Sequence, residues 1–372
     1  MTGSSISLGK VSGIPVRLHW TFLLLLIWVA VSQISIGGSL AAGVAGAVFL
    51  AAIFVCVVLH ELGHCFAARY YGISTKHITL SPLGGVAALD ATPRNWKEEL
   101  WVSLAGPAVN VAICIALLPI LVLNPPAPGE LMMPSATLGA FAAKLFIGNM
   151  VMVIFNLLPA FPMDGGRVFR ALLESRKDRL TATRIAARTG QGFAVFFALT
   201  GLSISLILVF IGIFIFLAAE GEYRMVESQE RLKGIPASSV MRTRFEVIDS
   251  CDTISDALRK SAWYGQDSFP VVGGGRVTGM LDRSALQKAA MKNDLRVPVG
   301  NYAITDYAMA TPGDDLAMIQ DLIARTGQTA LPVFEAGDLI GLIDQRAVAS
   351  MFHAPVREIF TSRSPETEKA SK

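Results

Sequence analysis

Long apolar stretches constrain the fold of this chain more than any other feature of its sequence. About 20 apolar residues in a helix span the hydrocarbon core of a bilayer, where only helices and closed barrels satisfy their backbone hydrogen bonds. We therefore expect a polytopic α-helical membrane protein. The segments predicted as helices are 19–35, 41–66, 100–123, 138–158 and 181–219.

The last of these segments is long enough for two spans. It holds two helices if Gly201 marks the turn, or one span after an interfacial piece. Two spans return the charged C-terminal part to the side from which they start, and we prefer this arrangement, which gives about six transmembrane helices.

Basic residues predict which side is cytoplasmic. The loops 36–40 and 124–137 contain no Lys or Arg, whereas the opposite helix ends are basic, and the basic side is cytoplasmic by the positive-inside rule. A basic segment, 167–188, is predicted on that side as a solvated connector facing lipid headgroups. We expect a multi-pass protein of the cell membrane with a cytoplasmic C-terminal part. The residues that flank the basic helix ends are Arg69, Lys76, Arg94 and Lys97.

A zinc signature closes the uncharged run 41–59. His60, Glu61 and His64 form an HExxH pattern, which on a helix places both imidazoles on one face to bind one Zn²⁺. Glu61, beside them, is placed to take a proton from the attacking water. The alternative is a chance string in a membrane helix, but ionisable groups at membrane depth are costly and usually serve a function.

A zinc hydrolase needs a third protein ligand, and Asp164 is the candidate. It follows the apolar stretch 145–158, where Pro159 and Pro162 are expected to break the helix. Irregular backbone at that depth requires surrounding protein or a water-filled cavity, and Gly165 and Gly166 allow a tight turn beside the metal. An ordinary Pro-Asp-Gly turn is the alternative.

Three motifs in order resemble the site-2 protease family of intramembrane zinc metalloproteases. They are the HExxH pattern, the segment 103–110 with Gly106 and Pro107, and the pattern NxxPxxPxDGGR over 156–167. The resemblance covers residues 1–220. It implies that His60, His64 and Asp164 bind zinc and that Glu61 is the catalytic base.

The resemblance also implies how the substrate is held. The segment 78–89, with Gly84 and Gly85, resembles a re-entrant hairpin whose residues 86–89 offer a strand edge to an unwound substrate, although a plain surface turn also fits. Asn156 is a candidate donor to the oxyanion, or else a packing amide. Asn110 and Asn149 are expected as packing amides, with contact to a zinc histidine as the alternative.

The C-terminal part is more polar and contains a repeat. Charged residues are sparse up to position 220 and dense after it, and the segments that begin at Phe269 and Leu331 repeat at a constant offset. The repeat resembles a tandem pair of CBS domains with α/β structure. The predicted domains are the protease domain 1–220, a linker 221–234, CBS repeats 235–296 and 297–360, and a disordered tail 361–372.

In the CBS family, the cleft between repeats often binds an adenine nucleotide. Here Ala285 and Ala347 replace the acidic residue that holds the ribose, which argues against nucleotide binding. Dimerisation through the paired repeats is expected, and a purely structural module is the alternative to a sensing one.

The predicted function is zinc-dependent hydrolysis of a peptide bond in or near the helix of a single-span membrane protein. The family resemblance adds that such substrates are membrane-anchored transcription regulators or their inhibitors. A CBS-regulated channel or transporter is the alternative, and an inactive scaffold a further one; neither needs Glu61. The net charge of +3 with no basic run argues against nucleic-acid binding.

Overall fold

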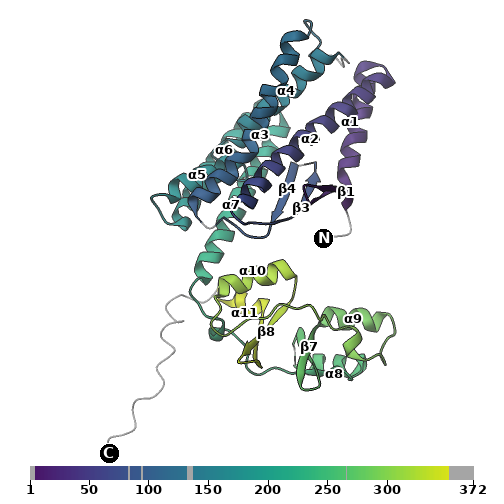
Figure 1. The fold of residues 1–372 in the computed structure, drawn as a ribbon, viewed down its shortest axis with the longest axis vertical. Coiled ribbons are helices and arrows are strands. Elements are labelled where there is room, and N and C mark those ends of the chain that lie inside the picture. Colours follow the sequence, from purple (N-terminus) through teal and green to yellow (C-terminus); the bar gives the residue numbers. More distant parts are fainter. Residues whose placement is uncertain (1–4, 83, 94, 132–136, 265, 352–372) are drawn as a thin grey trace, which may run out of the picture. The chain divides into compact units, whose positions relative to one another are not determined.

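The chain divides into two compact units. The computed structural model describes residues 5–351 except 83, 94, 132–136 and 265 (Figure 1). The units are Met1–Val226 and Glu227–Lys372, and each has hydrophobic cores of its own. The predicted disordered tail, 361–372, lies outside the described residues.

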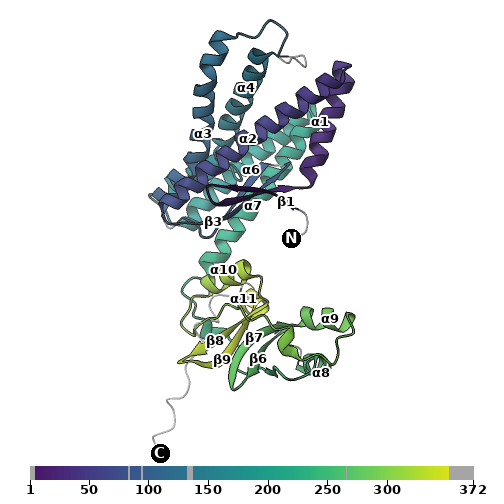
Figure 2. The same ribbon diagram turned by 45° about the vertical axis from the view of Figure 1, so that its right-hand side comes forward.

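The first unit is a bundle of helices (Figure 2). Among the described residues, four helices are long and apolar enough to span a membrane: α2, α3, α4 and α7. Helix α1 is apolar but shorter, so the count of six spans stays a prediction. The helices are α1 (Thr21–Gly37), α2 (Leu40–Tyr70), α3 (Trp96–Leu123), α4 (Leu138–Asn156), α5 (Asp164–Glu174), α6 (Arg179–Ile204) and α7 (Leu206–Leu232).

Several helices begin where a polar side chain caps the first turn. Ser39, Asn95, Thr137 and Asp178 each accept a hydrogen bond from a backbone N–H in the first turn of α2, α3, α4 and α6. Such caps satisfy donors that a helix start leaves free. They fix the first residue of four of the helices that build the bundle.

The predicted turn at Gly201 is wrong. The two helices in 181–219 separate at Ser205, and Gly201 is instead a buried residue of α6. A Cβ atom at Gly201 would lie 2.6 Å from the backbone nitrogen of Val209. This glycine therefore lets α6 and α7 approach closely.

A four-stranded sheet lies beside the bundle, and only part of it was predicted. The hairpin of β3 (Thr75–Ser81) and β4 (Gly84–Leu89) confirms the hairpin predicted near 78–89. Two N-terminal strands, β1 (Ser5–Val11) and β2 (Ile14–His19), were not predicted; β2 pairs with β3 in parallel. The strand order is β1-β2-β3-β4, so β4 is an edge strand.

The sheet is held against α2 by a small apolar core. Alternate residues of β2, such as Val16, and of β3, such as Ile78, are buried with Leu62 and Cys65 of α2. This alternation is the pattern of strands with one buried face. The packing places the sheet next to the part of α2 that carries His60 and His64.

The second unit confirms the duplicated module. In the first repeat, β5 (Ile248–Asp249), β6 (Ser268–Gly273) and β7 (Arg276–Asp282) pack with α8 (Ile254–Tyr264) and α9 (Arg283–Met291). In the second, β8 (Ala330–Glu335) and β9 (Asp338–Asp344) pack with α10 (Leu316–Thr326) and α11 (Gln345–Ser350). The helix and strand starts repeat at the predicted offset. Residues 221–234, the predicted linker, are helical up to Leu232 as the end of α7.

Candidate metal centre

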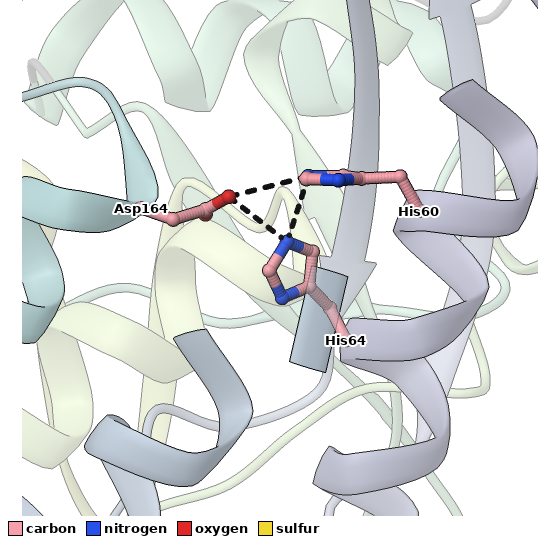
Figure 3. A group of neighbouring side chains, drawn as sticks. All are labelled: His60, His64 and Asp164. Carbon is pink, nitrogen blue, oxygen red and sulfur yellow. Dashed lines mark hydrogen bonds and ion pairs between the residues drawn. The ribbon is translucent and has the colours of Figure 1, made fainter. Parts of the chain in front are cut away.

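His60, His64 and Asp164 meet at one point in the bundle (Figure 3). The two histidine Nε2 atoms lie 3.1 Å apart, because positions 60 and 64 share one face of α2. The Oδ2 atom of Asp164 lies 3.2 Å from His60 Nε2 and 3.3 Å from His64 Nε2. The three side chains are only 6%, 12% and 15% exposed.

This triangle fits a zinc ion. Ligand atoms around a tetrahedral zinc ion with bonds of about 2.0–2.1 Å lie about 3.3 Å from one another. The Nδ1 atom of His64 donates to the carbonyl oxygen of Val102 at 2.7 Å, so its Nε2 atom presents a lone pair to Asp164. Among the described residues, the buried Oδ2 atom of Asp164 has no hydrogen-bond partner apart from its contacts with these two imidazoles. Lone pairs that converge in this way fit a metal cation.

Helix α3 orients both imidazoles. His60 Nδ1 contacts Asn110 Oδ1 at 3.1 Å, and the contact of His64 with Val102 is described above. Outer partners of this kind fix the tautomer and the orientation of a metal-binding histidine. Asn110 therefore makes the alternative contact, to a candidate zinc histidine, whereas Asn149 makes the predicted packing contacts, to Leu145 O and Cys56 Sγ.

Close approach of α3 to the imidazoles requires Gly106, which belongs to the second motif. A Cβ atom at this position would collide with the rings of both His60 and His64. Likewise, a Cβ atom at Gly63 would lie 2.7 Å from the carbonyl oxygen of Ala105. Gly106 therefore lets α3 approach the imidazoles, and Gly63 lets the backbones of α2 and α3 approach each other, both near the candidate metal centre.

Glu61 lies between the histidines and the sheet. Its side chain interacts electrostatically with His60, His64 and Asp164. It also packs on β4, because a Cβ atom at Gly85 would lie 2.6 Å from Glu61 Cγ and 3.0 Å from Glu61 Oε1. The edge strand and the candidate base are therefore neighbours.

The prediction of a helix break before Asp164 is confirmed. Helix α4 ends at Asn156, and α5 begins at Asp164, so the carboxylate lies at a helix N-terminus. Gly165 and Gly166 belong to α5, not to a turn: Cβ atoms there would meet the backbone of residues 157–161. Gly84, by contrast, has a φ of +124° at the start of β4.

One candidate functional residue, Arg170, was not predicted from the sequence. Arg170, expected in a solvated connector, is only 4% exposed and pairs with Glu99, which is 2% exposed. The signal was the isolated pair of acids, Glu98 and Glu99, directly before an uncharged stretch of helix. A buried guanidinium needs such a partner.

In the second unit, a cavity of about 330 Å³ lies between the two repeats. Asp267 pairs with Arg346 at 2.7 Å and with Arg283 at 3.8 Å, and Asp282 accepts a hydrogen bond from Thr329. Both arginines that line the cavity are therefore paired with Asp267, which also lines it. The main charged lining residues are Asp267, Asp282, Arg283, Asp344 and Arg346.

Known proteins resemble the chain along most of its length. Peptidase family M50 matches residues 48–128 and 127–200, and the CBS domain family matches 299–353. A zinc metalloprotease of Methanocaldococcus jannaschii is 33% identical over 347 residues, 92% of this chain and 94% of the relative. The Mycobacterium tuberculosis protein named Rip3 is 28% identical, covering 93% and 92%.

One solved structure is also similar to part of this chain. The site-2 protease from Methanocaldococcus jannaschii is 38% identical and covers 59% of this chain and 95% of its own, with a TM-score of 0.45. The sequence relative that spans more than nine-tenths of both chains, together with the converging His, His and Asp, identifies the family. The chain belongs to peptidase family M50, the site-2 protease family of intramembrane zinc metalloproteases, and carries a C-terminal CBS module.

Proposed function

We propose that this chain hydrolyses a peptide bond with a zinc ion held by His60, His64 and Asp164. The observation that carries the proposal is the triangle of three ligand atoms, with sides of 3.1, 3.2 and 3.3 Å. Three protein ligands would leave one position of a tetrahedral ion for water or substrate, as catalytic zinc sites require.

The metal ion, Glu61 and Asn156 share the proposed chemistry. His60, His64 and Asp164 would hold a zinc ion as a Lewis acid, which would lower the pKa of water and polarise the scissile carbonyl. Glu61 accepts the proton of the attacking water and later gives it to the leaving amine. Asn156 donates a hydrogen bond to the developing oxyanion, an interaction whose loss costs about 3 kcal/mol of barrier.

We propose that the substrate is a single-span membrane protein, such as a membrane-anchored transcription regulator or its inhibitor. Its peptide bonds become accessible only where its helix unwinds. The extended segment then pairs with the free edge of β4, which starts at Gly84 and contacts Glu61 through Gly85. This pairing presents one peptide bond to the base.

The chain's second unit is proposed as a regulatory CBS pair. Its repeats, 235–296 and 297–360, form a homodimer and modulate the protease domain, 1–220. Internal ion pairs in its cavity and Ala285 and Ala347 at the ribose positions argue against an adenine nucleotide as its ligand. By the positive-inside rule, the zinc site lies nearer the cytoplasmic face of the cell membrane and the module is cytoplasmic.

The test is co-expression with epitope-tagged single-span proteins. Wild type is expected to yield a shortened fragment on a gel, and Glu61→Gln the intact protein with zinc content unchanged. Glu335→Gln, an exposed change of the same kind on β8, is the matched control. Identical fragments from wild type and Glu61→Gln would show that another protease made them.

A further inference from the structure

Arg170 is a buried charge more than one turn beyond the candidate ligand Asp164 on the same helix, α5. At 4% exposure it is almost removed from solvent. Arginine is seldom buried so fully, and the desolvation it suffers requires well-formed partners. Its contacts therefore define what the residue does.

The guanidinium joins three other segments. Its Nε and Nη2 atoms donate to Glu99 Oε1 of α3, the Nε bond at 2.8 Å, and Nη1 donates to Glu222 Oε1 of α7 at 2.7 Å. The plane also lies over the ring of Phe161, 5.1 Å from its centre, in the loop that leads to Asp164. Both the loop before Asp164 and the helix after it are thus fixed by one side chain.

Glu99 belongs to the face of α3 that orients the histidines. Positions 99, 102, 106 and 110 are spaced by three or four residues and form one stripe. Val102 and Asn110 hold the two imidazoles, and Gly106 gives them room. The stripe therefore contacts the histidines of α2 at one end and the helix of Asp164 at the other.

We propose that Arg170 is a positioning residue of the metal centre, an inference that rests on the proposed function. Its fork on Glu99 holds α5 at the height on α3 where Asp164 Oδ2 reaches both Nε2 atoms. A planar fork fixes direction as well as distance, which a lysine ammonium does not. The arm to Glu222 stabilises the bundle without defining the position of Asp164 on α3.

Metal binding by purified full-length protein in detergent micelles tests the proposal. Cobalt(II) replaces zinc, and its visible absorption reports the ligand geometry of folded protein. Arg170→Gln is expected to alter the spectrum and to release cobalt to a chelator about tenfold faster or more. The spectrum and the release rate of Arg170→Lys are expected to lie between those of wild type and Arg170→Gln. Glu222→Gln and Arg176→Gln, an exposed change just after α5, are expected to keep the wild-type spectrum.

If Arg170 only stabilised the fold, replacing it would lower the unfolding temperature and leave the spectrum of the folded fraction unchanged. A wild-type spectrum and release rate in Arg170→Gln overturn the proposal. Where Arg170→Gln does not fold, Arg170→Lys decides: an altered spectrum supports positioning, and an unaltered one overturns it. If the wild-type protein binds no cobalt, or binds it no better than His60→Ala does, the proposed function itself is refuted.

Discussion

Gly106 supplies no ligand, yet its missing side chain makes room for two candidate ligands. We predict that Gly106→Ala lowers zinc affinity at least about tenfold, as losses around metal ligands usually do, because the added methyl group overlaps both imidazoles. Zinc per chain after dialysis against a weak chelator measures this. Gly192→Ala in α6, where a Cβ atom meets nothing within 4 Å, is the control. Full zinc content in Gly106→Ala contradicts the prediction.

Asn110 tests the orientation of His60. Asn110→Leu keeps roughly the side-chain size but removes the acceptor for Nδ1, so zinc affinity is expected to fall about 10–100-fold. A competition titration with a chelating dye measures it. Asn149→Leu removes a buried amide whose hydrogen bonds, within the described residues, go to Leu145 O and Cys56 Sγ, and it is expected to keep the wild-type affinity. Equal losses in both variants would mean that the effect is general destabilisation.

At the scale of elements, the edge strand β4 and the candidate base share one contact. Gly85→Ala places a Cβ atom within 2.6 Å of Glu61 Cγ, so the glutamate must move. Because a misplaced catalytic group costs about 100-fold, we predict a similar fall in fragment formation. Zinc content is the internal control and is expected to stay at the wild-type level. Cleavage at the wild-type rate would show that Glu61 tolerates displacement.

Helix α8 depends on a reciprocal cap. Thr253 Oγ1 accepts from the N–H of Asp256, and the Asp256 carboxylate accepts from the N–H and hydroxyl of Thr253. These bonds, with Arg259, hold the pKa of Asp256 below its ordinary value. The stability they provide is therefore complete above the unfolded pKa and is lost as pH falls through the folded one.

Thr253→Ala is expected to destabilise the second unit by about 1 kcal/mol at neutral pH. The difference from wild type should shrink in acid, where Asp256 becomes protonated. Urea unfolding followed by proteolysis of this unit, at neutral and at acidic pH, measures both effects. A difference that does not change with pH would contradict the assigned role of the carboxylate.

The apolar helices and the motif residues were predictable from the sequence, whereas most pairings between distant segments were not. The HExxH spacing is local and predicts that His60 and His64 share one face of a helix. Asp164 was predicted from the need for a third zinc ligand and from the motif that resembles the site-2 protease family.

The pairing of β2 with β3 was missed because two helices separate these strands along the chain. The hairpin of β1 and β2 is local, and its turn at Ser12 and Gly13 was a signal that the prediction overlooked. Arg170 was misread because its partner Glu99 lies 71 residues away, and charge alone suggested solvent.

At the scale of the whole molecule, each unit has its own hydrophobic core, so we predict that one unit can unfold without the other. Ile343 is fully buried in the core of the second repeat, so Ile343→Ala is expected to cost about 2–5 kcal/mol. Proteolysis should then cut the second unit at a lower temperature, while the cobalt spectrum stays unchanged. Val247→Ala, at a 38% exposed position, is the control. Simultaneous loss of both units would show that they unfold cooperatively.

The stripe of positions 99, 102, 106 and 110 on α3 limits which substitutions the chain tolerates. A shift of this helix by one residue rotates its side chains by more than a quarter of a turn and moves them along the axis. The contacts of α3 with both imidazoles and with α5, the helix that begins at Asp164, would then be lost together. The opposite side of α3, with Trp101, Ile115 and Leu118, is exposed and free to vary among apolar residues. A helix that supplies no ligand is thus constrained on one side by the ligands that it orients, and not on the other.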